Sequence, residues 1–265
     1  MKNVEIFNTL DGSIGLFNKE LDEIYHSKFG ANKEAFEKFI EPAFVLNNKP
    51  LKILDVCYGI GYNTKCALEN FSSINSIDCI EIDKELALKS YEFEYSEKIN
   101  KIIENNIKNP NFINFFIEDA RIAIKKINKK YDIIFHDGFA PHKQSVLWSE
   151  DFICELISKL EFDGIYCTYN SSKPVLNALS KCGLILGKTI KHEKCIGIVA
   201  SFKKELIKNP LNSFEIGQLR TKSAIKYKDK ELKLSHAEII KNRNLEVEKS
   251  KLETLSHYLK CNKVD

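Results

Sequence analysis

Short apolar segments alternate with helical ones from residue 51 to residue 202, and this alternation constrains the fold more than any other feature of the chain. Buried strands are expected at 51–61, where the strand runs into a glycine-containing turn, and at 74–83, 112–119, 131–137 and 163–170. Helices are expected at 62–71, 84–98, 120–129, 149–160 and 174–182, and a closing antiparallel strand pair at 183–191 and 195–202. The sequence therefore predicts an α/β, Rossmann-like fold with a mostly parallel, doubly wound sheet.

The length and composition suit one large α/β domain, with or without appendages. The chain has 265 residues, and 43% of them are hydrophobic. It contains no run of about 18 apolar residues, so no membrane-spanning helix is expected. Because the first residues, MKNVEIFNTLDGS, lack the apolar core of a signal peptide, we expect a cytoplasmic protein.

The eight cysteines do not form a metal-binding pattern. No two of them form a CxxC motif, and the six histidines show no ligand spacing near them. Most of the cysteines fall in expected strands and helices. We therefore expect buried thiols in a reducing compartment, without a disulfide framework and without a metal site.

The net charge of +3 is unevenly distributed along the chain. Residues 203–265 hold 15 Lys and Arg against 9 Asp and Glu, a net of +6, whereas residues 1–202 hold 25 against 28, a net of −3. A basic tail on a nearly neutral body favours an anionic partner, with RNA as one candidate. Since lysine is abundant throughout the chain, a solvated tail without a partner is the alternative.

Glycines and acids follow the first four expected strands, at the edge where parallel α/β sheets bind ligands. They are Gly59 and Gly61 after the first strand, Glu81 and Asp83 at the second, Asp119 at the third and Asp137 at the fourth. Taken singly, each has an ordinary explanation as a turn glycine or a solvated cap. Polar ends on four consecutive strands indicate a binding site.

The loop after the first strand indicates a ligand without phosphates. A GxGxxG motif is absent because Thr64 occupies the third glycine position, and no GxxxxGK[ST] motif occurs. S-adenosylmethionine fits this pattern, since its amino-acid end can pass the loop that runs from Gly59 to Asn63. Its ribose hydroxyls can then meet Glu81, and its adenine amine can meet Asp119.

Segments spread over most of the chain are similar to one known family. The most specific of them is DGFAPHKQSVLW (137–148), in which an acid, a glycine and a proline precede the only tryptophan. Further matching segments are TLDGS (9–13), YHSKFGANKEAF (25–36), DVCYGIGYN (55–63), DGIYCTYNSSKPVLNALSKCGL (163–184), GIVAS (197–201) and YKDKELKLSHAEIIKNR (227–243). With them the chain resembles the methyltransferase domain of MnmC, the bifunctional enzyme of 5-methylaminomethyl-2-thiouridine biosynthesis in tRNA, and above all the stand-alone members that lack the oxidase half. It departs from the family pattern at His142, where the bifunctional enzymes have a small residue, and in its lysine-rich tail.

The resemblance implies a class I S-adenosylmethionine-dependent methyltransferase without flavin or metal. Its expected substrate is the primary amine of 5-aminomethyl(-2-thio)uridine at the wobble position, presented by the tRNA anticodon stem-loop. The expected organisation is an N-terminal lid or substrate segment (1–50), a methyltransferase core (51–203) and a basic tail packed on the core (204–265). Tyr25, in the YHS segment, is expected to cover the cofactor, and Asn63 to contact it.

Within this resemblance, Asp137 is the expected catalytic residue. Its carboxylate can accept a hydrogen bond from the amine, aim the nitrogen lone pair and receive a proton. Phe139 offers a stacking face for an everted base, Pro141 stiffens the loop and Lys143 can meet a phosphate. We expect Trp148 to pack in the core.

Two other functions stay open at this point. One is a small-molecule amine methyltransferase or aminopropyltransferase on the same fold, which the DGFAP segment and the basic tail disfavour. The other is a non-catalytic RNA-binding protein. The presence of every expected site residue from Gly59 to Asp137 disfavours that second function.

Overall fold

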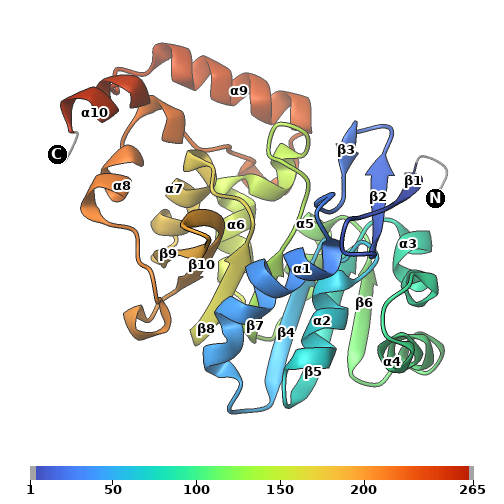
Figure 1. Cartoon of the computed structure of the whole chain (residues 1–265). Helices are drawn as coiled ribbons and strands as arrows, with labels where there is room; N and C mark the ends of the chain where they lie inside the picture. Colours follow the sequence, from blue (N-terminus) through green and yellow to red (C-terminus); the bar gives the residue numbers. More distant parts are fainter. Residues whose placement is uncertain (1–3, 263–265) are drawn as a thin grey trace.

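A seven-stranded, mostly parallel sheet forms the centre of the protein, as predicted. The structure is a computed structural model and describes residues 4–262. Its strand order is β6-β5-β4-β7-β8-β10-β9 (Figure 1). The strands are β4 (Leu51–Val56), β5 (Ile74–Glu81), β6 (Ile113–Ile117), β7 (Tyr131–His136), β8 (Leu160–Thr168), β9 (Ile185–Lys191) and β10 (Lys194–Ser201). The first five pair in parallel, and β10 lies antiparallel to both β8 and β9, so the predicted terminal antiparallel pair is confirmed.

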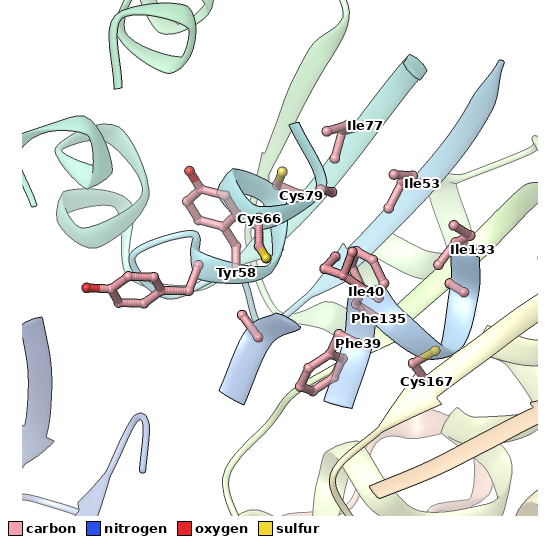
Figure 2. Close-up of a cluster of buried hydrophobic side chains, with 14 of the residues drawn as sticks. Phe39, Ile40, Ile53, Tyr58, Cys66, Ile77, Cys79, Ile133, Phe135 and Cys167 are labelled. Carbon is pink, nitrogen blue, oxygen red and sulfur yellow. The ribbon is translucent and has the colours of Figure 1, made fainter. Parts of the chain in front are cut away.

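Alternate residues of the strands pack into two apolar layers, one on each face of the sheet. Ile53, Ile133 and Phe135 point into the first layer, where Phe39 meets Phe135 with ring centroids 5.9 Å apart (Figure 2). Leu54 and Ile134 point into the second layer. The helices between the strands are α2 (Tyr62–Asn70), α3 (Lys84–Leu88), α4 (Glu97–Lys108), α5 (Ala120–Lys126), α6 (Glu150–Ile157) and α7 (Lys173–Lys181).

One predicted helix was wrong. Residues 84–98 do not form one helix: α3 ends at Leu88, a 3-10 turn covers Ser90–Glu92, and α4 begins at Glu97. The buried ammonium group of Lys65 donates hydrogen bonds to the carbonyl oxygens of Ser90 (2.8 Å) and Phe93 (3.3 Å). These carbonyls are therefore turned toward α2 and not along a helix axis.

Residues 4–50 form a layer of their own over the sheet. A three-stranded antiparallel sheet, which the sequence did not predict, consists of β1 (Val4–Asn8), β2 (Ile14–Asn18) and β3 (Glu23–Ile24). It leads into α1 (Ala31–Ala35) and the π-helical turn Phe36–Ile40. In Figure 1 this small sheet and helix α9 both lie toward the upper end of the view.

The basic tail packs on the second face of the sheet. It contains α8 (Ser213–Gln218), α9 (His236–Lys249) and α10 (Leu255–Cys261). Leu219, Tyr227 and Ile239 are buried in the second apolar layer. The division of the chain at residues 50 and 203 remains a prediction, and residues 263–265 of the tail lie outside the described part.

Two of the cysteines form a disulfide, so the expectation of thiols alone was wrong. Cys154 of α6 and Cys182, which caps the C-terminus of α7, are bonded, with Cα atoms 5.6 Å apart. They are separated by 28 residues in the sequence and meet only because α6 and α7 pack side by side. Between residues 4 and 262, no helix has the length and apolar character needed to cross a membrane, and no group of three potential metal ligands occurs.

Candidate active site

A cavity of about 430 Å³ opens at the carboxyl ends of the central strands. The walls come from the end of β5, from the segments that follow β4, β6, β7 and β8, and from the N-terminal layer. They include five residues that the sequence predicted, Tyr25, Glu81, Asp119, Asp137 and Phe139. The other predicted residues, Gly59, Gly61, Asn63, Pro141 and Lys143, are not among the wall residues.

The glycine loop after β4 has a conformation that side chains rarely adopt. Gly59 and Gly61 have φ angles of 58° and 82°, in the left-handed region. A Cβ atom at Gly61 would lie 2.3 Å from the hydroxyl oxygen of Tyr58, and one at Gly59 would meet the Tyr25 ring at 3.6 Å. Both glycines are therefore needed for the loop to turn into α2 beneath Tyr25.

Glu81 holds this loop in place. Its Oε2 accepts a hydrogen bond of 2.8 Å from the amide of Gly59, and its Oε1 accepts from the amides of Ile82 and Asp83 at 2.8 and 2.9 Å. Burial raises the pKa of this carboxyl, although the three amides counteract the effect. A carboxylate offers about four acceptor positions, so Oε2 keeps one for a ligand. Asp83, by contrast, caps α3 by accepting from the amides of Glu85 and Leu86.

Asp119 is engaged by an arginine that the sequence analysis did not single out. Arg121 donates to Oδ2 of Asp119 through Nη2 at 2.9 Å and to Oδ2 of Asp229 through Nη1 at 3.0 Å. It also donates to the carbonyl oxygen of Leu234 at 2.8 Å. Burial acts to raise the pKa of Asp119, but the hydrogen bonds and charge of Arg121 hold it below the ordinary value. One guanidinium group thus connects the cavity wall to the C-terminal tail.

Asp137 lies half-buried directly after β7. Its Oδ2 accepts a hydrogen bond of 2.9 Å from the side-chain amide of Asn63, in the first turn of α2. Burial, with the negative charges of Glu34 and Asp55, raises the pKa of Asp137 to about 8, against the opposing effects of Asn63 and Lys38. A carboxyl group with such a pKa can exchange a proton near neutral pH.

The rest of the DGFAP segment is held rigidly. Phe139 meets the ring of Tyr25 edge to face, with centroids 4.8 Å apart, and its carbonyl oxygen accepts from Nε1 of Trp148 at 2.6 Å. Trp148 is fully buried, as predicted, and stacks on His136 at 4.1 Å. Pro141 is buried in the turn that follows, and Lys143 is partly exposed.

Sequence reasoning missed three polar residues at or beside the cavity. Asp55, at the end of β4, is fully buried, and its Oδ1 has no hydrogen-bond partner among the described residues. Burial raises its pKa to about 7, although Thr64 donates to Oδ2 at 2.7 Å. His26 and Glu34 line the cavity from the N-terminal layer. Asp55 had a sequence signal in its place at a strand end before the glycine loop, and His26 and Glu34 lie in the 25–36 segment that carries the family resemblance.

These features fit S-adenosylmethionine. The loop offers no phosphate-binding motif, and the free acceptor position on Glu81 suits a ribose hydroxyl.

Comparisons with known proteins point the same way. The sequence profile of a family described as S-adenosyl-L-methionine-dependent methyltransferase matches residues 84–203. The crystal structure of MnmC2 from Aquifex aeolicus superimposes with a TM-score of 0.81 and is 30% identical in sequence, covering 93% of this chain and 86% of that one. Spermidine synthase from Thermotoga maritima, with a TM-score of 0.56 and 17% identity over 91% of this chain and 83% of that chain, shares the fold alone.

Two curated relatives differ in how much of their length is matched. An uncharacterized protein of Methanocaldococcus jannaschii is 29% identical over 98% of this chain and 77% of its own length. The tRNA 5-methylaminomethyl-2-thiouridine biosynthesis bifunctional protein MnmC of Campylobacter hominis is 24% identical over 66% of this chain, but only 29% of its own length is matched. With the likeness to MnmC2 over nearly its whole length, this chain belongs to the MnmC-like family of S-adenosylmethionine-dependent methyltransferases.

Proposed function

We propose that this protein methylates the primary amine of 5-aminomethyl(-2-thio)uridine at the wobble position of tRNA, giving 5-methylaminomethyl(-2-thio)uridine. The observation that carries the proposal is the state of Asp137, a cavity carboxyl with a pKa of about 8 that is fixed by Asn63. The names of the bifunctional relatives support the choice of tRNA and of this modification.

Asp137 has the properties that methylation of an alkyl amine requires. A simple alkyl amine has a pKa near ~10, so at neutral pH it arrives as an ammonium ion and must lose a proton. The ionised form of Asp137, which the approaching ammonium charge favours, takes that proton, and the side chain then orients the neutral amine. When bound, S-adenosylmethionine would supply a methyl group on a sulfonium sulfur that leaves with the bonding electron pair, and Asp137 would aim the nitrogen lone pair at that methyl carbon. Orientation by a fixed group contributes strongly to such a displacement.

The proposed cofactor-binding roles use three wall residues, Tyr25, Glu81 and Asp119, and the adjoining loop from Gly59 to Asn63. Glu81 would accept from the ribose hydroxyls, and Asp119, held by Arg121, from the adenine amine. Gly59 and Gly61 give the amino-acid end room to approach the backbone, with Asn63 beside it. Tyr25 would cover the cofactor from the N-terminal layer.

The tRNA would be bound by the DGFAP segment and the basic tail. Phe139 is proposed to stack against the everted wobble base, with Pro141 limiting the movement of the loop. Lys143 and exposed lysines of the tail would contact phosphates of the anticodon stem-loop.

The deciding experiment supplies labelled S-adenosylmethionine and bulk tRNA from cells that cannot make this modification. Nucleoside mass spectrometry should reveal 5-methylaminomethyluridine in the 5-aminomethyl tRNA and no product from the 5-carboxymethylaminomethyl form. Free polyamines serve as the comparison substrate for the spermidine-synthase-like alternative. Label transfer to polyamines but not to tRNA would contradict the proposal, and cofactor binding without any transfer would favour a binding protein.

A further inference from the structure

Glu34 stands in the cavity wall with Asp137 but was not expected there from the sequence. It belongs to the short helix α1 of the N-terminal layer, whereas Asp137 follows β7 of the central sheet. After burial, the charge of Glu34 is the largest cause that raises the pKa of Asp137. The two side chains therefore line the same cavity, one from the N-terminal layer and one from the central sheet.

The Glu34 side chain is fixed from both sides. Its Oε2 accepts a hydrogen bond of 2.7 Å from the amide of Ser27, and its Oε1 is paired with the ammonium group of Lys38. Each oxygen keeps an acceptor position, because a carboxylate offers about four and these contacts use two. Glu34 thus holds the YHS segment at the cavity and keeps capacity for a ligand.

Contacts continue from Lys38 around the cavity to the catalytic loop. Its Nζ lies 5.7 Å from the ring centroid of Tyr169, another wall residue. The hydroxyl of Tyr169 donates to the carbonyl oxygen of Gly138 at 2.8 Å, one residue after Asp137. This series of contacts connects Lys38, the partner of Glu34, to the loop that carries Asp137.

A neutral histidine, His26, lies in the same wall. The buried Nε2 of His26 has no hydrogen-bond partner among residues 4–262, and its ring packs edge to face on Tyr62 at 4.9 Å. Burial lowers the pKa of His26 to about 4, so the imidazole is neutral and carries one N–H donor and one acceptor nitrogen. Two carboxylates and a neutral imidazole match a group that carries several N–H donors and a positive charge.

We propose that Glu34 is a second substrate-recognition residue, which with Asp137 forms an anionic subsite for the aminomethyl group in its ammonium form. This rests on the proposed function and adds a basis for specificity. The ammonium ion binds between the carboxylates and passes one proton from nitrogen to Asp137, which leaves a neutral amine and a protonated carboxyl. A 5-carboxymethylaminomethyl group carries a carboxylate of its own, which Glu34 and Asp137 repel.

The test compares Glu34→Gln with wild type. Glutamine keeps an acceptor for the amide of Ser27 but removes the charge, and Glu37→Gln, on the adjoining turn and outside the cavity wall, is the matched control. We expect Glu34→Gln to raise the KM for 5-aminomethyl tRNA at least about tenfold, the scale of one charge-assisted hydrogen bond. The Kd for S-adenosylmethionine should stay within about twofold. Discrimination against the 5-carboxymethylaminomethyl form should shrink.

The pH profile supplies a readout that a merely structural role would not move. Asp137 is influenced by Glu34 from α1, Lys38 from the following turn, Asp55 from β4 and Asn63 from α2. Removing the charge of Glu34 lowers the pKa of Asp137, so the acidic limb of the activity profile should move to lower pH. An unchanged KM and an unchanged pH profile in an active Glu34→Gln enzyme would overturn this inference and leave the proposed function standing.

Other outcomes separate the possible ligands and the possible failures. If Glu34→Gln raises the Kd for the cofactor and leaves the KM for tRNA unchanged, Glu34 contacts the amino-acid end of the cofactor, and its role in substrate recognition is refuted. Wild type that is inactive on 5-aminomethyl tRNA would remove the proposed function and this inference together. If Glu34→Gln does not fold, inhibition of wild type decides: ethylammonium should compete with tRNA and ethanol should not, and equal effects of the two would refute the subsite.

Discussion

The side-chain amide of Asn63 donates a hydrogen bond of 2.9 Å to Oδ2 of Asp137. This contact joins the helix that follows the glycine loop to the residue that follows β7. One hydrogen bond therefore positions the carboxyl group of Asp137, which fits the amine, relative to the glycine loop, which fits the cofactor. The sequence predicted Asn63 as a cofactor contact, and the structure gives it this further positioning task.

Substitution of Asp137 should separate binding from chemistry. Asp137→Ala is expected to lower methyl transfer at least about a hundredfold, because the variant has no positioned proton acceptor, while the cofactor Kd changes little. Transfer is followed with labelled cofactor and binding by calorimetry. Asp163→Ala, at an exposed site paired with Lys49, is the control. Near-normal turnover of Asp137→Ala would remove this residue from the mechanism.

The raised pKa of Asp137 has a consequence for stability in the absence of ligand. The unfolded chain ionises this residue near its ordinary pKa of 3.8, whereas the folded protein does so at about 8, so folding loses stability between these values as pH rises. Asp137→Asn removes this loss. Its Tm should exceed that of wild type at pH 9 by more than at pH 4, as measured by thermal unfolding. A Tm difference that does not grow with pH would contradict the raised pKa.

Gly59→Val should abolish cofactor binding. Valine is strained at a φ of 58°, and its Cβ would already be in van der Waals contact with the ring of Tyr25, at 3.6 Å. Gly12→Val is the matched control, since Gly12 also has a left-handed φ, of 82°, but has open space around it and is not a wall residue. Calorimetry should show binding by the Gly12 variant and none by the Gly59 variant. Equal cofactor binding by both variants would show that the left-handed backbone conformation at Gly59 is not needed for the cofactor site.

The two acids at the end of β5 should differ in their effects. Glu81→Ala frees three backbone amides and removes the acceptor proposed for the ribose, so the cofactor Kd should rise at least about tenfold. Asp83→Ala removes the N-cap of α3 and should cost about 1 kcal/mol of stability, with a smaller change in Kd. Calorimetry and thermal melts of both variants check this. The reverse order of Kd values would identify Asp83 as the ribose ligand.

The tail is best tested by charge, because its truncation would expose buried residues such as Ile239. Lys241 and Lys249 are exposed on α9, and replacing both with Gln should weaken tRNA binding and reduce the slope of log K against log salt. The slope should fall by about 0.9 for every phosphate of a duplex stem that the variant no longer neutralises. The matched pair on α4, Lys98 and Lys101, should have no such effect. An identical slope for both pairs would leave the tail with a structural role.

The sheet could be predicted because its signal is local. Each strand is a short apolar run, and Glu81, Asp119 and Asp137 stand where such runs end, so their meeting at one cavity follows from parallel pairing. The chemistry of the DGFAP segment could be approached only through the family resemblance.

The features that escaped prediction depend on interactions between distant parts of the chain. The ammonium group of Lys65 donates to carbonyl oxygens 25 and 28 residues further along the chain, where the helix predicted at 84–98 is interrupted. Glu34 lies on a five-residue helix, too short to show a periodic pattern, and reaches the cavity only because the N-terminal layer folds over the sheet. The disulfide likewise depends on how two helices pack.

The arginine that joins Asp119 to Asp229 has a consequence for the order in which the protein matures during synthesis. Residues 119 and 121 emerge from the ribosome well before the tail, since Arg121 precedes Asp229 by 108 residues. Until residues 229–234 have been made and have docked, the guanidinium group has only one of its two carboxylates and lacks the carbonyl oxygen of Leu234. The wall proposed for adenine therefore reaches its final charge balance only after residues 229–234 have been translated and have docked on Arg121.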